Sequence, residues 1–206
     1  MSTVIDSSVQ QVNSIDNAAI EQLFTKAHTA YDFDATPVTD AQLEQIYELT
    51  KMAPSSMNAQ PLRVTYIKSA EAKARLLPLI PESNRKKSES APVVAILSAD
   101  VDFHEHFDHL QPHNPKAKNN FPDPARREQF ARFNASIQAG YFILAVRAVG
   151  LDVGPMAGVN IDGITAEFLA GTNQKALFIV NIGKASKTGN YPRSGRLSYQ
   201  QAVTVL

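Results

Sequence analysis

The sequence predicts an α+β protein. Two continuous apolar runs, Val93–Leu97 and Ala176–Ile182, are bounded by Pro92 and Gly183 and have the pattern of fully buried central strands. Most other periodic segments have the three-to-four residue spacing of helices. Few strands among many helices favour α+β over a doubly wound sheet. The chain has neither a G-x-G-x-x-G motif nor a P-loop motif, so a nucleotide-like cofactor would need another architecture.

The length of 206 residues corresponds to one domain with a sizeable core. We predict a loose tail over residues 1–15 and a single domain over residues 16–206. The first twenty residues contain Asp6 and Asp16 and have no basic start, so they do not read as a secretory signal. The expected location is therefore the cytoplasm.

Composition excludes several classes of partner and site. Lys plus Arg and Asp plus Glu number 20 each, so no overall field favours nucleic acid or an anionic membrane. The absence of cysteine excludes disulfides, thiolate metal sites and a thiol nucleophile. The longest apolar run, near Tyr141–Val146, ends at Arg147, far short of the roughly 18 residues of a membrane span. We expect no nucleic-acid or membrane partner.

Helices and one short strand are predicted in the first half of the chain. A helix covers Asn17–Ala30, and Thr39-Asp40-Ala41-Gln42 is a capping box that begins a second helix. One face of that second helix carries Leu43, Ile46, Tyr47 and Thr50. The run Arg63–Ile67 predicts a strand, and Ser69 caps a third helix. The third helix carries Leu76, Leu77 and Ile80.

The segment Pro124–Gly150 is the strongest predicted helix. One apolar stripe consists of Phe130, Phe133, Ile137, Tyr141, Leu144 and Ala148. A second stripe consists of Ala135, Ala139, Phe142, Val146 and Val149. A helix that is apolar on two sides is buried on two sides. This pattern predicts packing against the sheet and against a partner subunit; the alternative is a helix buried wholly within one monomer.

The loop Ala53-Pro54-Ser55-Ser56-Met57-Asn58-Ala59-Gln60-Pro61 lies between a predicted helix and a predicted strand. Proline fixes φ and lacks an N–H, so Pro54 ends the helix and Pro61 delays the strand. Hydroxyls, amides and backbone N–H groups fill the interval, which suits a flat polar ligand. An ordinary turn is the alternative, because Ser, Asn and Pro are common in turns.

The pattern A-P-S-S-x-N-x-Q-P resembles the cofactor loop of the nitroreductase family of FMN-dependent oxidoreductases. The resemblance extends over roughly residues 20–206. It implies a central mixed or antiparallel sheet flanked by helices, in an intertwined homodimer with a C-terminal extension. It also assigns Pro54, Ser55, Ser56 and Asn58 to FMN, largely across the dimer interface.

The run Asn84-Arg85-Lys86-Lys87 precedes the strand at Val93. Taken alone, a basic run on a helix is usually a solvated face. The family places Asn and, three residues later, Lys against the flavin, and Asn84 and Lys87 match that spacing. The resemblance therefore implies that Lys87 is catalytic, because an ammonium stabilises the negative charge of reduced flavin.

The glycine-rich segment Gly150–Gly158 follows the long helix. Gly150 is read as the end of that helix, and the glycine spacing suggests a close backbone approach. The remainder resembles the G-x-x-P-x-x-G turn of nitroreductases, whose backbone N–H groups face the flavin ring. That resemblance assigns Pro155, Met156, Ala157 and Gly158 to the cofactor.

Two segments are candidates for the flavin phosphate. The family closes this site with a basic residue followed by Leu, which Arg196 matches best and Arg193 second. Many members also begin with R-x-S-x-R-x-F, whereas this chain has His28, Thr29 and Phe33 and lacks both arginines. Since histidine is only partly charged near neutral pH, phosphate binding should depend mainly on Arg196 and be sensitive to pH.

Four histidines, His104, His106, His109 and His113, raise the alternative of a metal-dependent enzyme. Helical spacing joins His106 to His109, and Pro112 would end the helix before His113. No recognised ligand spacing is present. We therefore expect no metal site, and instead a surface helix at the edge of the substrate pocket.

Within the family, the chain looks most similar to the malonic semialdehyde reductase branch. The matching pieces include Thr36-Pro37-Val38, Leu110-x-Pro112-His113 and Phe133-Asn134-x-Ser136-x-Gln138. This branch implies reduction of 3-oxopropanoate to 3-hydroxypropanoate by ping-pong hydride transfer through flavin N5, with NADPH or NADH as co-substrate. The alternatives are a broad-specificity nitro or quinone reductase and a flavin-binding protein without NAD(P)H turnover.

Overall fold

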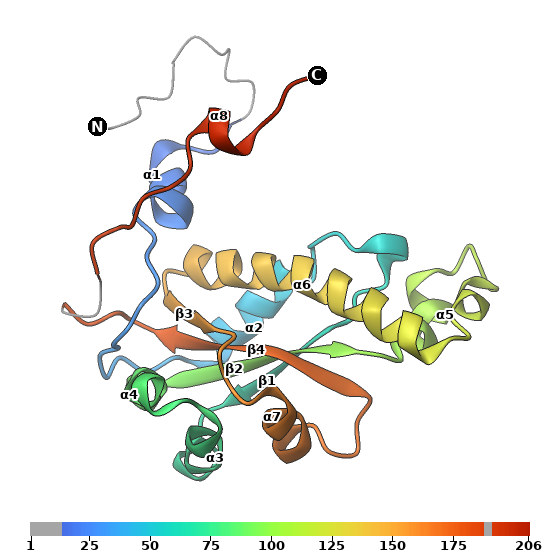
Figure 1. Ribbon diagram of the computed structural model, residues 1–206, viewed down its shortest axis with the longest axis horizontal. Coiled ribbons are helices and arrows are strands. Elements are labelled where there is room, and N and C mark those ends of the chain that lie inside the picture. Colours follow the sequence, from blue (N-terminus) through green and yellow to red (C-terminus); the bar gives the residue numbers. More distant parts are fainter. Residues whose placement is uncertain (1–13, 188–190) are drawn as a thin grey trace.

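The computed structural model describes residues 14–187 and 191–206, so most of the predicted N-terminal tail lies outside the described residues. A four-stranded sheet forms the centre, in the order β1-β2-β4-β3, and every neighbouring pair is antiparallel. Helices cover both faces of the sheet (Figure 1). The predicted α+β architecture with a central sheet flanked by helices is confirmed.

The two predicted central strands are confirmed as β2, Val93–Asp100, and β4, Gln174–Gly183. Their side chains alternate between the two faces: Val93, Ala95 and Leu97 enter one core, whereas Val94 and Ile96 enter the other. The predicted strand at Arg63–Ile67 is confirmed as β1, Leu62–Ile67, which lies at one edge of the sheet. The fourth strand, β3, Asp152–Met156, was not expected, because Gly and Pro weaken the strand pattern.

Helix α6, Pro124–Ala148, lies across one face of the sheet (Figure 1). Asp123 caps its first turn, and Pro124 occupies the first helical position. At the other end Gly150 has a φ of 80°, and its N–H bonds the Arg147 carbonyl while that of Leu151 bonds the Val146 carbonyl. These two bonds form a Schellman motif, which confirms Gly150 as the residue that ends the helix.

Only one of the two apolar stripes of α6 is buried in the monomer. Ala135, Ala139 and Phe142 are fully enclosed against the sheet. Phe133 and Tyr141 of the other stripe keep 65% and 43% of their surface exposed. The alternative of a helix buried wholly within one monomer is therefore wrong.

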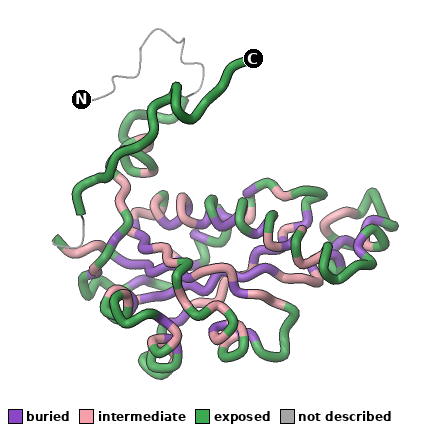
Figure 2. The backbone as a smooth tube through the Cα atoms, viewed as in Figure 1, coloured by how far each residue is buried: buried purple, intermediate pink, exposed green. Residues whose placement is uncertain are grey.

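The opposite face of the sheet carries helices α3, Ala70–Leu76, α4, Glu82–Ser90, and α7, Ile161–Phe168 (Figure 1). Ser69 caps α3 as predicted, since its hydroxyl accepts from the N–H of Ala72. The predicted extension to Ile80 is wrong: a 3₁₀ turn, η3, covers Leu77–Leu79, because Pro78 cannot continue an α-helix. Figure 2 shows the buried sheet between exposed helix surfaces.

Helix α2, Asp40–Thr50, begins at the predicted capping box of Thr39 and Gln42. Leu43, Ile46 and Thr50 are buried, whereas Tyr47 is 50% exposed. Tyr47 is four positions from Leu43 and three from Thr50, so it belongs to the predicted face but lies at its exposed edge.

The N-terminal helix is shorter than predicted. Helix α1, Asn17–Ile20, continues into a π-helical turn, η1, Glu21–Thr25, so the segment after Thr25 is not helical. Ala30 instead donates a backbone hydrogen bond of 2.8 Å to Val153. Helix α1 and the C-terminal segment with α8, Tyr199–Ala202, extend from the body on the same side (Figure 1).

The connections contain several short helical turns. These are η2, Ser56–Asn58; η4, Phe103–His106; α5, Phe107–Leu110; and η5, Ala117–Asn120. Among the described residues, no helix combines the length and the apolar character that a membrane crossing requires.

Candidate functional site

The segment of residues 26–33 follows η1, and we call it the first loop. A small cavity of about 140 Å³ lies between the first loop, α4, β3 and β4, and we call it the lysine cavity. Its lining includes five residues predicted to contact a cofactor: Thr29, Asn84, Lys87, Pro155 and Met156. They come from three segments far apart in the sequence. The fold therefore brings together groups that the family resemblance assigned to the cofactor.

Lys87 is held in place from two directions. Its ammonium donates a 2.7 Å hydrogen bond to the side-chain carbonyl of Asn84, three residues earlier on α4. The same ammonium lies 4.4 Å from the centre of the Tyr31 ring, a cation–π contact. Asn84 and Lys87 are about one helical turn apart, so their side chains lie next to each other, as the three-residue spacing predicts.

Within the Gly150–Gly158 segment, Gly154 is the position at which no side chain would fit without a clash. A Cβ atom there would lie 2.6 Å from the backbone oxygen of Ala30. Gly158, by contrast, has nothing within 4 Å of such an atom. The predicted close approach is thus between β3 and the first loop, and it forms one wall of the lysine cavity.

Asn181 also lines the lysine cavity and was missed in the sequence. It is 1% exposed, and neither its side-chain oxygen nor its nitrogen has a hydrogen-bond partner among the described residues. The available signal was one amide within the otherwise apolar run Ala176–Ile182. Buried polar groups are normally paired, so an unpaired amide in a cavity wall points to a ligand.

A second cavity of about 370 Å³ adjoins the first, and we call it the arginine cavity. Thr29 and Tyr31 line both cavities. The predicted phosphate residues His28, Arg193 and Arg196 all line the arginine cavity. None of the described residues in its lining is acidic, so this concave surface favours an anion.

Arg147, from the last turn of α6, is a further basic residue of the arginine cavity that sequence analysis missed. Burial and the nearby positive charge of Arg193 lower the pKa of Arg147, and Asp152 partly opposes this. The guanidinium donates to the Leu23 carbonyl at 3.2 Å. The repulsion between two guanidinium groups would be relieved by a bound anion.

The two predicted arginines differ in their attachments. Arg193 donates to the backbone carbonyls of Thr25 and Ala27, at 2.9 and 2.6 Å, and so fastens the C-terminal segment to the first loop. Arg196 bonds only carbonyls of its own segment, those of Ser194 and Gly195. Arg193 is consequently the better anchored of the two, and the preference for Arg196 as the phosphate ligand stays a prediction.

The loop around Pro54 is fastened by hydrogen bonds of its own. The Ser56 N–H donates to the side chain of Asn134 at 2.7 Å, and the Gln60 N–H donates to the Ser55 hydroxyl at 3.0 Å. Met57, Asn58 and Gln60 all have positive φ, between 43° and 56°. Left-handed residues other than glycine are costly and concentrate at functional sites, which favours the ligand reading of this loop.

Pro54, Ser55, Ser56 and Asn58 do not reach the lysine cavity within the chain. The loop enters β1 at Leu62, opposite Ala99 of β2, whereas α4 enters β2 at its other end, where Val94 is opposite Ile67. The two candidate surfaces therefore lie at opposite ends of the sheet. Ala157 and Gly158 follow β3 at the surface and line neither cavity; Pro155 and Met156 belong to β3 rather than to a turn.

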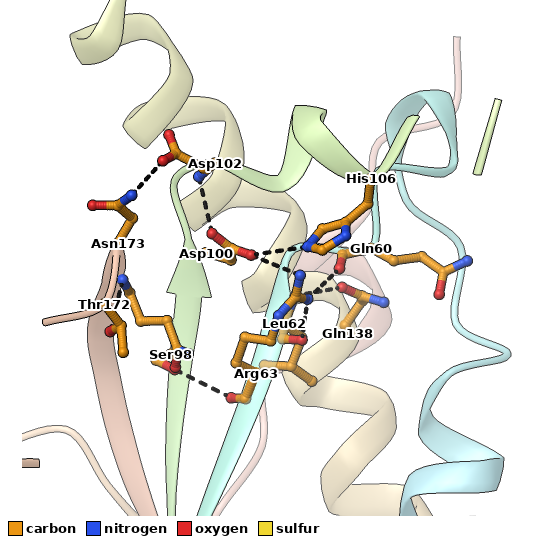
Figure 3. A network of polar contacts seen from close by, with 11 residues as sticks. Gln60, Leu62, Arg63, Ser98, Asp100, Asp102, His106, Gln138, Thr172 and Asn173 are labelled. Atoms are coloured by element: carbon orange, nitrogen blue, oxygen red, sulfur yellow. Dashed lines mark hydrogen bonds and ion pairs between the residues drawn. The ribbon is translucent and has the colours of Figure 1, made fainter. Parts of the chain in front are cut away.

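A third cavity, of about 350 Å³, borders the Pro54 loop and is lined by Lys51, Arg63, His106 and His109 among others. Figure 3 shows Arg63 and His106 converging on Asp100. The Arg63 guanidinium lies 2.7 Å from that carboxylate, and the His106 ring nitrogen lies 3.6 Å from it. His106 and His109 thus line a cavity, and its role as a substrate pocket stays a prediction.

His104 departs from the predicted surface helix. It is 8% exposed and packs beside Phe103 and Phe121 in an aromatic cluster. Helix α5 ends at Leu110, so Pro112 and His113 lie beyond it as predicted. Within residues 14–187 and 191–206, no three His, Asp or Glu side chains are arranged to hold a metal ion.

The model of the Nitroreductase family matches residues 24–184 of the chain. A Leptothrix cholodnii protein provisionally named NADH dehydrogenase/NAD(P)H nitroreductase is 47% identical, over 94% of this chain and 99% of that protein. A Streptomyces coelicolor protein with the same provisional name is 50% identical, over 88% of this chain and 90% of its own length. The family model thus covers every segment that lines the lysine cavity, whereas the Tyr191–Arg196 part of the arginine cavity lies beyond its end.

Solved structures share the fold at lower identity. A Bacillus subtilis protein provisionally named nitroreductase aligns with a TM-score of 0.80 at 21% identity, over 92% of this chain and 99% of its own. An Exiguobacterium sibiricum protein provisionally named nitroreductase, in complex with FMN, aligns with a TM-score of 0.79 at 20% identity, over 96% and 100%. At these identities the likeness extends to the fold alone.

Proposed function

The chain belongs to the nitroreductase family, and on that premise we propose that it is an FMN-dependent NAD(P)H oxidoreductase. The observation that carries the proposal is the convergence of Asn84 and Lys87, Thr29, and Pro155 and Met156 on one cavity beside a basic one. We also propose a cytoplasmic location, where the reduced nicotinamide co-substrate is available.

The residues fit FMN on features of this chain. The arginine cavity offers Arg147, Arg193, His28 and Arg196 to a phosphate dianion, and none of its described lining is acidic. The lysine cavity offers the unpaired amide of Asn181 and the backbone of Gly154, which has no side chain in the way. Thr29 and Tyr31, which line both cavities, place the two binding surfaces next to each other.

FMN, when bound, supplies a carrier that takes a hydride from NAD(P)H and passes it to an acceptor. Lys87 would hold its ammonium against the cofactor edge that becomes negative on reduction, with Asn84 fixing the position of the ammonium. The basic groups of the arginine cavity would orient the cofactor. The protein itself therefore needs no ionisable nucleophile.

We further propose the intertwined homodimer. The exposed stripe of Phe133, Ile137 and Tyr141 on α6 is a large apolar surface for a monomer to leave in water. The C-terminal segment also leaves Tyr199 and Val205 exposed. Since the Pro54 loop lies at the far end of the sheet from Lys87, a partner subunit would be needed to bring the two together.

The proposed acceptor is a small carboxylate such as 3-oxopropanoate. The cavity beside the Pro54 loop is supported in this role by the basic side chains of Lys51, His106 and His109. If the loop reaches the partner's cofactor, these groups would lie near the acceptor and bind its carboxylate. The word nitroreductase in the names of the 47–50% identical relatives favours the nitro-reducing half of the second candidate, a broad-specificity nitro or quinone reductase.

The test is an absorption spectrum of the purified protein, followed by anaerobic addition of NADPH or NADH. Flavin bands that bleach on addition are expected, and re-oxidation by 3-oxopropanoate, menadione or a nitroaromatic compound would then rank the acceptors. Parallel initial-velocity lines are expected for ping-pong turnover. A protein that fails to bind added FMN would overturn the proposal, and bound flavin that stays oxidised would point to a binding role without turnover.

A further inference from the structure

We infer that Asn181 is a cofactor-positioning residue whose side-chain amide hydrogen-bonds the ribityl chain of bound FMN. The inference rests on the proposed function and adds a residue to that site. It starts from one observation: Asn181 is 1% exposed, yet both polar atoms of its side chain lack a hydrogen-bond partner among the described residues.

The position of Asn181 in β4 explains why the amide is aimed into the lysine cavity. Its neighbours Val180 and Ile182 belong to the core beneath α6, so Asn181 points to the opposite face of the sheet. There it is paired in register with Gly154 on β3 and Val94 on β2. Because Gly154 has no side chain, nothing on that strand covers the amide, and a Cβ at Gly154 would lie 3.7 Å from the Asn181 nitrogen.

The order of the two cavities indicates which part of FMN would meet Asn181. The arginine cavity suits the phosphate, and it adjoins the lysine cavity through Thr29 and Tyr31. In FMN the ribityl chain follows the phosphate directly. Its hydroxyl groups both donate and accept hydrogen bonds, as a carboxamide does, so the two groups are complementary.

The test compares full-length wild-type protein with Asn181→Leu, prepared with and without FMN. Leucine has a similar branched shape but no polar atoms. Removing an unpaired buried amide should raise the melting temperature of the FMN-free protein by about 2–4 °C. The same change should weaken FMN binding about tenfold, because one or two hydrogen bonds are lost.

Ser88→Ala is the matched control. Ser88 is fully buried on α4, its hydroxyl also has no partner among the described residues, and it does not line the lysine cavity. This variant should raise the melting temperature without changing FMN affinity. Asn181→Thr, which keeps one hydroxyl and suits a strand, provides a second variant with an intermediate loss of affinity.

Riboflavin and lumiflavin identify the part of the cofactor involved. Riboflavin keeps the ribityl chain without the phosphate, so Asn181→Leu should weaken it by the same factor as FMN. Lumiflavin has no ribityl chain, and its affinity should be unchanged. Equal FMN affinity of wild type and both Asn181 variants, or an equal loss with lumiflavin, would overturn the inference; absence of FMN binding by the wild type would instead overturn the proposed function.

Discussion

The two ends of the sheet differ in how far their polar groups are paired in hydrogen bonds. At the Lys87 end, Asn181 is buried without a partner, and Arg147 and Arg193 stand close together although their charges repel. At the Pro54 end, the loop is fastened by side chains such as Asn134, which accepts from Ser56, and Gln138, which accepts from the N–H of Leu62 at 3.0 Å.

The difference shows two ways of preparing a binding surface. The Lys87 end leaves the Asn181 amide without a partner among the described residues, so this amide would gain partners only when a ligand arrives. The Pro54 end uses its hydrogen bonds internally and thereby holds three residues in left-handed conformations. The first end should therefore be stabilised by its ligand, whereas the second should hold its shape without one.

Gly154→Ala should have the largest effect, at the Lys87 end. The new Cβ would lie 2.6 Å from the Ala30 carbonyl, and both groups belong to backbones joined by a hydrogen bond. We expect a loss of about 3 kcal/mol in the free energy of unfolding and loss of FMN binding. Urea unfolding and FMN titration measure the two effects, with Gly158→Ala as the control for stability. Unchanged stability would mean that β3 and the first loop are not in close contact.

Asn134→Leu should have the next largest effect, at the Pro54 end. The fully buried Asn134 side chain accepts a hydrogen bond from the Ser56 N–H and donates one to the Phe130 carbonyl. Leucine can form neither bond. The expected loss is about 2 kcal/mol of unfolding free energy, seen equally with and without FMN if the loop supports itself. Greater protease sensitivity near Met57 should accompany it. A gain in stability, as expected for Asn181→Leu, would erase the contrast between the two ends.

Lys87→Met should leave the free energy of unfolding nearly unchanged while it alters the reduction potential of bound flavin. Loss of the ammonium should make the bound flavin harder to reduce, lowering its two-electron potential by about 30 mV, equivalent to about 1.4 kcal/mol. Titration against a reference dye measures the potential. Lys86→Met, one residue away on the exposed side of α4, is the control. A similar shift in both variants would remove the special role of Lys87.

Tyr66 should give the smallest effect near neutral pH, because its hydroxyl makes only a long 3.4 Å bond to the Leu43 carbonyl. Burial raises the pKa of Tyr66 to about 12 from its ordinary value near 10. The unfolded chain therefore loses the phenol proton first, and stability should be unaffected below pH 10 and fall as the pH rises toward 12. Tyr66→Phe should remove this part of the alkaline loss in urea titrations. Since Tyr66 packs on Phe142 of α6, Gly154→Ala and Asn134→Leu should keep the alkaline slope.

The residues of the candidate site that could be predicted are those whose chemistry and spacing can both be recognised within a short stretch of sequence. Asn84 and Lys87 are one helical turn apart, so their contact follows from sequence once the segment is helical. Arg147 and Asn181 could not be found this way. Arg147 is a cation at a helix end, and Asn181 is one interruption of an apolar strand. Each gains a role only through neighbours more than twenty positions away, which no local pattern records.

The sequence by itself determined the elements whose signals are local. The capping box at Thr39, the buried strands β2 and β4 and the end of α6 at Gly150 all depend on residues within a turn or two of one another. Tertiary structure decided the rest. Strand β3 forms because β4 offers it hydrogen-bonding partners despite Gly154 and Pro155, and the exposed stripe of α6 is set by which face the sheet covers. The physical reason is that burial and pairing depend on contacts between distant segments, and these exist only once the chain has folded.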